Sequence, residues 1–174
     1  WWNGAGYLIP TRGWDGSLTG GQVRRRAADG GRYLWGINDL QLANGEMPLQ
    51  ILTGDSKKPA YFIEGTGAKP WKIHIETGAT VIGAAGGQHA SSPEQLQFVL
   101  DQTEGQLRVL LPDAGSHQNE MVMSQYKRLA DLVPELHVQW WNQLEKSDSD
   151  ADETEFWADG RQILSTEFFS AEFK

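Results

Sequence analysis

Residues 60–65 of this chain are Ala60-Tyr61-Phe62-Ile63-Glu64-Gly65, a short apolar run that ends in a carboxylate and a glycine. Aromatic and β-branched residues favour a strand, and the glycine lets the backbone turn where that strand ends. In open α/β sheets, ligands bind beside the carboxyl ends of the strands. Glu64 is therefore either a solvated acid at a strand end or part of a binding site, and this stretch alone leaves both interpretations open.

Two later apolar runs are also followed by acids. Residues 107–111 lead into Pro112-Asp113-Ala114-Gly115, and residues 136–141 precede the acid run Asp148-Ser149-Asp150-Ala151-Asp152-Glu153. Because the carboxyl ends of parallel strands meet at one edge of a sheet, we expect the three acidic segments to converge there. Hard divalent cations prefer oxygen ligands arranged in this way. The pattern therefore predicts a cation site at one edge of the sheet.

From residue 60 onwards, strand-like and helix-like segments alternate. Strands are expected at residues 60–63, 80–82, 107–111 and 136–141. Helices are expected at residues 68–76, from Pro93 onwards, at residues 119–132 and at about residues 155–168. This order predicts an α/β fold with a mostly parallel sheet of about four strands, flanked by helices.

The N-terminal part of the chain has a different pattern, in which short strand-like runs at residues 6–10, 18–26 and 32–35 alternate with turns. Bases gather on this β-rich unit, which holds Arg12, Arg24, Arg25, Arg26 and Arg32 against Asp15 and Asp29. The arginines either alternate between solvent and pairing with an acid or contact phosphates. Residues 37–59 are expected to form a loop-rich connection with a short strand within 47–52. We therefore predict a β-rich basic subdomain and its connection at residues 1–59, followed by an α/β catalytic domain at residues 60–174.

The chain has 174 residues, of which 39% are hydrophobic, so it is long enough to bury a core. Its formal charge is −8, but residues 145–155 alone hold six acids against Lys146, so net charge does not exclude a polyanionic partner. No apolar run approaches the roughly 20 residues of a membrane span. The absence of cysteine excludes disulfides and thiolate zinc sites. We expect a cytoplasmic protein without a membrane partner, and the start at Trp1-Trp2 suggests a piece of a larger chain.

Other motif-like segments indicate no specific chemistry. The glycine-rich segment 83–87 fits neither the dinucleotide-binding nor the P-loop pattern, so we expect a tight turn between a strand and a helix. The four histidines show no metal-binding spacing, and His117 is the one that lies near an acid of interest, Asp113. Trp140-Trp141 is expected in the core rather than as a platform for nucleotide bases.

Together, the acidic segments resemble the Toprim domain, which is shared by DnaG-type primases, type IA and type II topoisomerases and some nucleases. Phe62-Ile63-Glu64-Gly65 resembles its glutamate motif. Leu111-Pro112-Asp113-Ala114-Gly115 resembles its Asp-x-Asp motif, with Gly115 in place of the second aspartate. Lys146-Ser147-Asp148-Ser149-Asp150-Ala151-Asp152-Glu153 resembles the last motif, in which either Asp148 and Asp150 or Asp150 and Asp152 form the pair.

The N-terminal unit is similar to the basic β-rich subdomain that precedes Toprim in DnaG-type primases. The similarity is carried by Leu8-Ile9-Pro10-Thr11-Arg12, Asp15-Gly16, Gly20-Gly21-Gln22-Val23-Arg24 and Arg32-Tyr33-Leu34. Over residues 6–155 the chain looks closest to the Toprim-like domain of large cyanobacterial plasmid and phage replication proteins, which usually lies beside a helicase domain.

This resemblance implies a DNA primase-like nucleotidyltransferase, which makes primers on a single-stranded DNA template from nucleoside triphosphates. Its catalytic residues are expected to be Glu64, Asp113 and Asp150. Mg²⁺ or Mn²⁺ is expected to be held by Glu64, Asp113, Asp148, Asp150 and Asp152 and to stabilise charge on the transferred phosphoryl group. Phosphates are expected to contact Arg24, Arg25, Arg32 and Lys69. A helicase domain in the same or an associated chain is the expected partner.

Two alternatives remain open at this stage. A Toprim nuclease would use the same acids and metals to hydrolyse a phosphodiester, although the basic N-terminal unit favours a primase. A non-catalytic nucleic-acid-binding module of a replication protein would have lost the chemistry, and Gly115 in place of an aspartate favours that interpretation. A topoisomerase is disfavoured, because no tyrosine has the context of a nucleophile.

Overall fold

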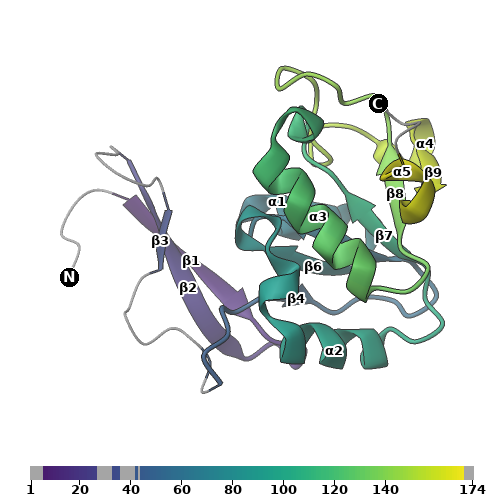
Figure 1. Cartoon of the computed structure of the whole chain (residues 1–174). Coiled ribbons are helices and arrows are strands. Elements are labelled where there is room, and N and C mark those ends of the chain that lie inside the picture. Colours follow the sequence, from purple (N-terminus) through teal and green to yellow (C-terminus); the bar gives the residue numbers. More distant parts are fainter. Residues whose placement is uncertain (1–5, 27–32, 36–41, 43, 171–174) are drawn as a thin grey trace.

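The strands of the chain form two separate sheets, which lie side by side in the computed structural model (Figure 1). The structure describes residues 6–26, 33–35, 42 and 44–170. The first sheet is antiparallel, in the order β1-β2-β3, with strands β1 (Gly6–Arg12), β2 (Leu18–Arg25) and β3 (Tyr33–Trp35). The β-rich N-terminal unit is thus confirmed, while Arg32 lies outside the described residues.

The second sheet contains the four parallel strands expected from the sequence. They are β5 (Ala60–Glu64), β6 (Thr80–Ala84), β7 (Arg108–Leu111) and β8 (His137–Trp140), and they lie in the order β6-β5-β7-β8. Nearly every residue of these strands is buried. Such continuous apolar runs are typical of parallel strands that are covered on both faces.

The sheet has six strands rather than four, because an antiparallel strand is added at each edge. Strand β4 (Gln50–Leu52) pairs with β6, and β9 (Arg161–Leu164) pairs with β8. The expectation of a short strand within residues 47–52 is confirmed, and this strand belongs to the second sheet. The division of the chain at residue 59 stays a prediction.

The expected helix at residues 155–168 is wrong. The segment instead forms α4 (Phe156–Asp159), β9 and α5 (Ser165–Phe168). Gly160 follows α4 with an extended backbone, at a point where a side chain would meet Gln139. Within β9 only Ile163 is buried and the other three residues are exposed, which fits a strand at the edge of a sheet.

Helices cover both faces of the six-stranded sheet. Helices α2 (Pro93–Gln102) and α3 (Glu120–Leu132) pack on one face through a core that includes Phe62, Leu110 and Leu129. Helix α1 (Ala68–Thr77) packs on the other face, where Ile63 and Ile73 are buried. Short 3₁₀ turns complete the connections: η1 (Ala85–Gly87), η2 (His89–Ser91) and η3 (Ser116–Gln118). Within the described part of the chain, no helix is long and apolar enough to cross a membrane.

Side-chain hydrogen bonds join the two sheets. Gln22 of β2 accepts a buried hydrogen bond of 2.8 Å from the hydroxyl of Thr66, in the loop after β5. The side-chain oxygen of Gln50 in β4 accepts another, of 3.2 Å, from the amide of Arg12. The N-terminal sheet is therefore attached next to the loop that begins at Glu64.

His89, the first residue of η2, is fully buried, and its ring packs edge-on against Phe62 of β5. Its ring nitrogens lie 3.0 Å from the carbonyl oxygen of Ile82 and 3.2 Å from that of Gly87. Burial lowers the pKa of His89 to about 4, and the two carbonyl contacts oppose this shift. The folded protein therefore binds this proton more weakly than the unfolded chain, whose histidines titrate near 6.5.

This difference predicts an acid-sensitive contribution to stability, which is present above pH 6.5 and is lost as the pH falls towards 4. When the pH falls from 7 to 5, the unfolded chain takes up a proton at this histidine and the folded protein does not. The free energy of unfolding of the wild type should therefore fall by about 2 kcal/mol. The variant His89→Gln should not show this component. Urea unfolding of both proteins at the two pH values measures the difference, and parallel losses in both proteins would contradict the assignment.

Candidate active site

Glu64 lies at the carboxyl end of β5, where the chain turns sharply. Gly65 has a φ of +97°, and its amide donates a hydrogen bond of 2.7 Å to the carbonyl oxygen of Ala84 at the end of β6. At Gly83 a side chain would collide with the carbonyl oxygen of Gly65. The two glycines therefore let the loop fold tightly over β6, and the Glu64 carboxylate stays half-buried at the edge of the sheet.

Lys69 joins the two other acids that the sequence singled out. Its ammonium lies 2.6 Å from the carboxylate of Asp113, which follows β7, and 2.8 Å from that of Asp150, in the loop after β8. All three side chains are largely buried, with 13–24% of their surface exposed. The lysine comes from the first turn of α1. Three segments far apart in the sequence thus meet at one ammonium group.

A second contact fixes Asp150 to the turn after β7. The other carboxylate oxygen of Asp150 accepts a hydrogen bond of 2.8 Å from the amide of Ala114. The amide of Asp150 donates in turn to Glu153, at 3.2 Å. This geometry places Asp150 at the site and does not distinguish the two registers of the acid run, because Asp150 belongs to both pairings.

Burial and charge give the acids at this edge different proton affinities. Burial raises the pKa of Asp113 to about 6, Glu64 and Asp150 add to the rise, and Lys69 opposes it. Burial also acts to raise the pKa of Asp150, but hydrogen bonds from Lys69 and the Ala114 amide hold it below its usual value. Burial alone would lower the pKa of Lys69, yet the two aspartates raise it. Lys69 is therefore charged at neutral pH.

Sequence reasoning missed Tyr126, which it placed on the apolar face of α3. The Tyr126 hydroxyl donates to the Glu64 carboxylate at 3.3 Å, and it accepts from the amide of Asp113 at 3.4 Å. A buried tyrosine hydroxyl generally needs a polar partner. A single tyrosine in an otherwise aliphatic helix stripe, facing strands that end in acids, is the signal that was available in the sequence.

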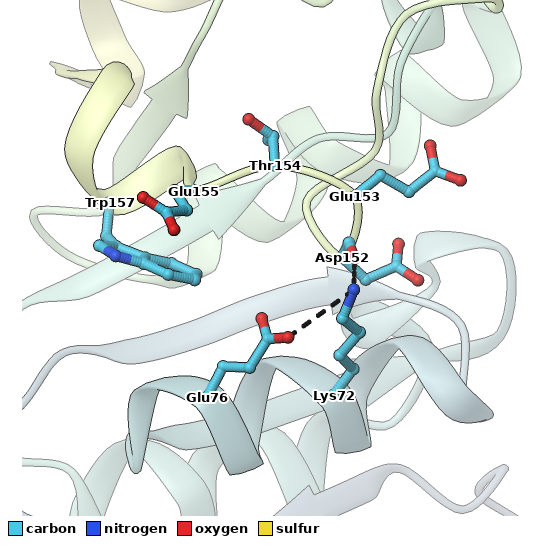
Figure 2. A pocket seen from close by; sticks show the side chains of 7 residues that line it. All are labelled: Lys72, Glu76, Asp152, Glu153, Thr154, Glu155 and Trp157. Carbon is cyan, nitrogen blue, oxygen red and sulfur yellow. Dashed lines mark hydrogen bonds and ion pairs between the residues drawn. The ribbon is translucent and has the colours of Figure 1, made fainter.

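The other members of the acid run lie elsewhere. Asp148 is exposed and accepts a hydrogen bond of 2.7 Å from the amide of Glu145 within its own loop. The backbone carbonyl of Asp152 accepts from Lys72 on α1, and Lys72 also pairs with Glu76 (Figure 2). Asp152 lines a groove of about 440 Å³ together with Lys72, Glu76, Glu153, Thr154, Glu155 and Trp157.

The predicted phosphate-binding residues are distributed over two places. Lys69 lies among the acids, whereas Arg24 and Arg25 lie on β2. The guanidinium of Arg24 donates to the hydroxyl of Tyr7 at 2.6 Å and stacks over the Tyr7 ring at 5.7 Å. His117 is exposed, and its ring packs edge-on against Trp140.

Gly115, which stands where the resemblance expects an aspartate, has a structural reason to be glycine. Its φ is +70°, and a Cβ there would lie 2.7 Å from the backbone nitrogen of Lys146. Its own amide donates to the carbonyl oxygen of Gln143 at 3.1 Å. The turn after β7 therefore packs directly against the loop that carries Asp150, which leaves no room for a second carboxylate.

The carboxylates suit a hard divalent cation in their chemistry. Mg²⁺ and Mn²⁺ prefer oxygen ligands, and the ammonium of Lys69 shows that a positive charge is accommodated between Asp113 and Asp150. In the described residues as they stand, no three His, Cys, Asp or Glu side chains are grouped as a metal site. A divalent ion shared by Asp113 and Asp150 would therefore require Lys69 to move.

Comparisons with known proteins give only remote similarity to solved structures. No protein-family model matches the chain, and no curated protein matches it. A solved chain comes from a complex of bacteriophage T7, described as the lagging-strand DNA polymerase interacting with primase domains of two gp4 subunits bound to an RNA/DNA hybrid and dTTP. The match has 12% identity and a TM-score of 0.45, and it covers 84% of this chain and 68% of the other. A likeness of this size establishes neither family nor activity.

The Lys69 bridge predicts a pH-dependent loss of stability in Lys69→Met. Removing the ammonium leaves Asp113 and Asp150 uncompensated, so at pH 7 the variant should lose about 3–5 kcal/mol of unfolding free energy. The loss should be smaller at pH 5, because Asp113 has a pKa of about 6 and is then mostly protonated. Lys72→Met, an exposed lysine on the same helix, is the matched control and should change little. Equal losses for both variants in urea unfolding would refute the bridge.

The packing of Gly115 predicts that restoring the expected aspartate is harmful. Gly115→Asp should destabilise the fold more than Gly105→Asp, because both glycines have a positive φ but Gly105 faces open space. The shared backbone strain is worth about 1–3 kcal/mol, so any excess in Gly115→Asp measures the collision with Lys146. Thermal unfolding of both variants makes the comparison. A Gly115→Asp protein as stable as the Gly105→Asp protein would show that the turn has room after all.

Proposed function

We propose that this chain catalyses metal-dependent nucleotidyl transfer in DNA replication, in the form of primer synthesis on a single-stranded template. The observation that carries the proposal is the meeting of Glu64, Asp113 and Asp150 at one edge of a parallel sheet, beside Lys69. Acids gathered at the carboxyl ends of parallel strands are typical of a ligand site rather than of core packing. The motifs that resemble a Toprim domain are the same residues.

Glu64, Asp113 and Asp150 are the residues that would hold Mg²⁺ or Mn²⁺. When bound, such an ion supplies charge stabilisation for the transferred phosphoryl group. The resemblance also implies Asp148 and Asp152 as ligands. Asp148 accepts a hydrogen bond within its own loop, and the backbone carbonyl of Asp152 accepts one from Lys72, so the case for these two residues is weaker. We therefore place Asp150 in the central role.

Lys69 has two roles open to it at the same edge. Here it compensates part of the negative charge of Asp113 and Asp150, which would otherwise repel each other and Glu64 more strongly. Its ammonium is also a suitable donor to phosphate oxygens of a nucleotide or a template. An exchange between these partners would couple substrate binding to the charge state of the acids.

The basic N-terminal sheet supplies the path for the template. Side chains two residues apart lie on the same face of a strand, so Arg24 shares a face of β2 with Gln22. Gln22 is bonded to Thr66 beside Glu64, and Arg24 is therefore the next polar group along that face. Arg25 lies on the opposite face. We propose that Arg24 contacts the template backbone, with a helicase domain as the partner that delivers single-stranded DNA.

A non-catalytic nucleic-acid-binding module is the second candidate. Two observations favour it: Lys69 already pairs with both Asp113 and Asp150, and the packing of Gly115 excludes the second aspartate of the Toprim pattern. A nuclease would use the same residues as the primase, so that the products of the reaction, and not the site, distinguish the two enzymes.

Extension of a single-stranded template with labelled nucleotides, with Mg²⁺, Mn²⁺ or EDTA, tests the proposal. Glu64→Gln keeps the shape and removes one charge, so extension should fall roughly 10²-fold or more while the fold and template binding persist. Glu104→Gln, at an exposed position in the turn after α2, is the matched control and should extend normally. Extension that survives EDTA or Glu64→Gln would refute the mechanism. Metal-dependent degradation without extension would identify a nuclease. Template binding that is unaffected by EDTA and by Glu64→Gln, with neither extension nor degradation by the wild type, would identify the binding module.

Template binding at several salt concentrations tests the role of Arg24. If Arg24 contacts one phosphate, Arg24→Ala should reduce the slope of log K against log salt by about 0.7, the value for one contact with a single strand. The loss of affinity should be similar for templates of different sequence, because phosphate contacts carry no sequence information. An unchanged slope would remove Arg24 from the template path.

A further inference from the structure

Tyr126 is a polar group in the core that the proposed function leaves unexplained. It lies in the middle of α3 with 0% of its surface exposed, and it packs in the same core as Phe62 and Leu129. A phenylalanine would fill this space with the same ring and would need no polar partner. The hydroxyl group is therefore the part of the side chain that requires an explanation.

The hydroxyl connects the first two acids of the site. It donates its proton to the carboxylate of Glu64 at 3.3 Å and accepts a hydrogen bond from the amide of Asp113 at 3.4 Å. One oxygen atom thus joins the side chain that ends β5 to the backbone that follows β7. Burial and the nearby Asp113 and Glu64 raise the pKa of Tyr126 well above its usual value. The hydroxyl therefore stays protonated and remains a hydrogen-bond donor.

The ring has little freedom to swing away from this position. Gly87, in the turn after β6, lies against its edge with a φ of +68°, and a Cβ at Gly87 would come within 2.9 Å of the ring carbon Cε1. Gly87, the last residue of the glycine-rich segment 83–87, therefore limits the movement of the tyrosine ring on this side. A hydroxyl group fixed by its own ring can fix the carboxylate that it contacts.

We propose that Tyr126 is a positioning residue for the metal-dependent reaction, and that it orients the Glu64 carboxylate relative to Asp113. This inference rests on the proposed function and adds a residue that none of the Toprim-like motifs contains. Groups that hydrogen-bond to a metal ligand typically change metal affinity 10- to 100-fold when they are removed. Tyr126 is not expected to touch the substrate.

Binding of Mn²⁺ alone, measured by calorimetry on the full chain, tests the proposal directly. Tyr126→Phe removes one oxygen and should weaken Mn²⁺ binding about tenfold. It should lower kcat for extension while leaving the KM for nucleotide nearly unchanged. Tyr61→Phe is the matched control, since Tyr61 is a buried tyrosine whose ring packs on the opposite face of the sheet, against Phe156. This control should bind Mn²⁺ like the wild type.

Different failures have different meanings. If wild-type protein binds Mn²⁺ and Tyr126→Phe binds it equally well, the positioning role is overturned and the proposed function stands. If wild-type protein binds no Mn²⁺, the proposed function is overturned, and the role of Tyr126 in it falls as well. A loss of thermal stability in Tyr126→Phe with unchanged Mn²⁺ affinity would assign the hydroxyl to the fold alone and would also overturn the proposal.

A measurement on the wild type covers the case in which Tyr126→Phe does not fold. The hydroxyl proton of a buried, hydrogen-bonded tyrosine exchanges slowly enough with water to be observed by NMR. The Tyr126 hydroxyl resonance should shift when Mg²⁺ is added, and it should shift in metal-free Glu64→Gln, whose acceptor has lost its charge. A resonance that responds to neither change would overturn the link between Tyr126 and Glu64.

Discussion

The arrangement of this chain depends on one ammonium group between two largely buried carboxylates. Lys69 joins helix α1 to the turn after β7 through Asp113 and to the loop after β8 through Asp150. Removing one partner of such a buried group leaves an uncompensated charge, which is far more costly than the pair is favourable. The position of the acidic loop on the sheet is therefore set by charge compensation as much as by apolar contact.

Sheet topology and charge compensation act on the same edge. The order β6-β5-β7-β8 brings the carboxyl ends of β5 and β7 side by side, so Glu64 and Asp113 are neighbours by construction. The hydroxyl of Tyr126, from helix α3, is hydrogen-bonded to both residues. Gln22 reaches the loop beside them from the other sheet. The edge is thus approached from both faces of the sheet and from the N-terminal unit.

The sequence predicted what depends on short-range pattern. Buried strands appear as uninterrupted apolar runs, and the acids after them mark the strand ends, so the four parallel strands and the location of Asp113 could be predicted. The segment 155–168 could not, because a four-residue strand with one buried residue, Ile163, is decided by pairing with β8. The partners of Lys69 lie 44 and 81 residues away along the chain, and those of the Tyr126 hydroxyl lie 13 and 62 residues away. No local periodicity encodes such contacts.

The antiparallel strands β4 and β9 close the two edges of the parallel sheet, and they come from opposite sides of the acidic segments in the sequence. A shortened chain that kept every acidic motif, such as residues 60–155, would lack both. It would leave β6 and β8 as bare parallel edges with unpaired backbone groups, which are templates for pairing with other chains. A fragment whose sheet has both parallel edges covered must therefore include β4 and β9, and so it extends beyond the acidic motifs at both ends.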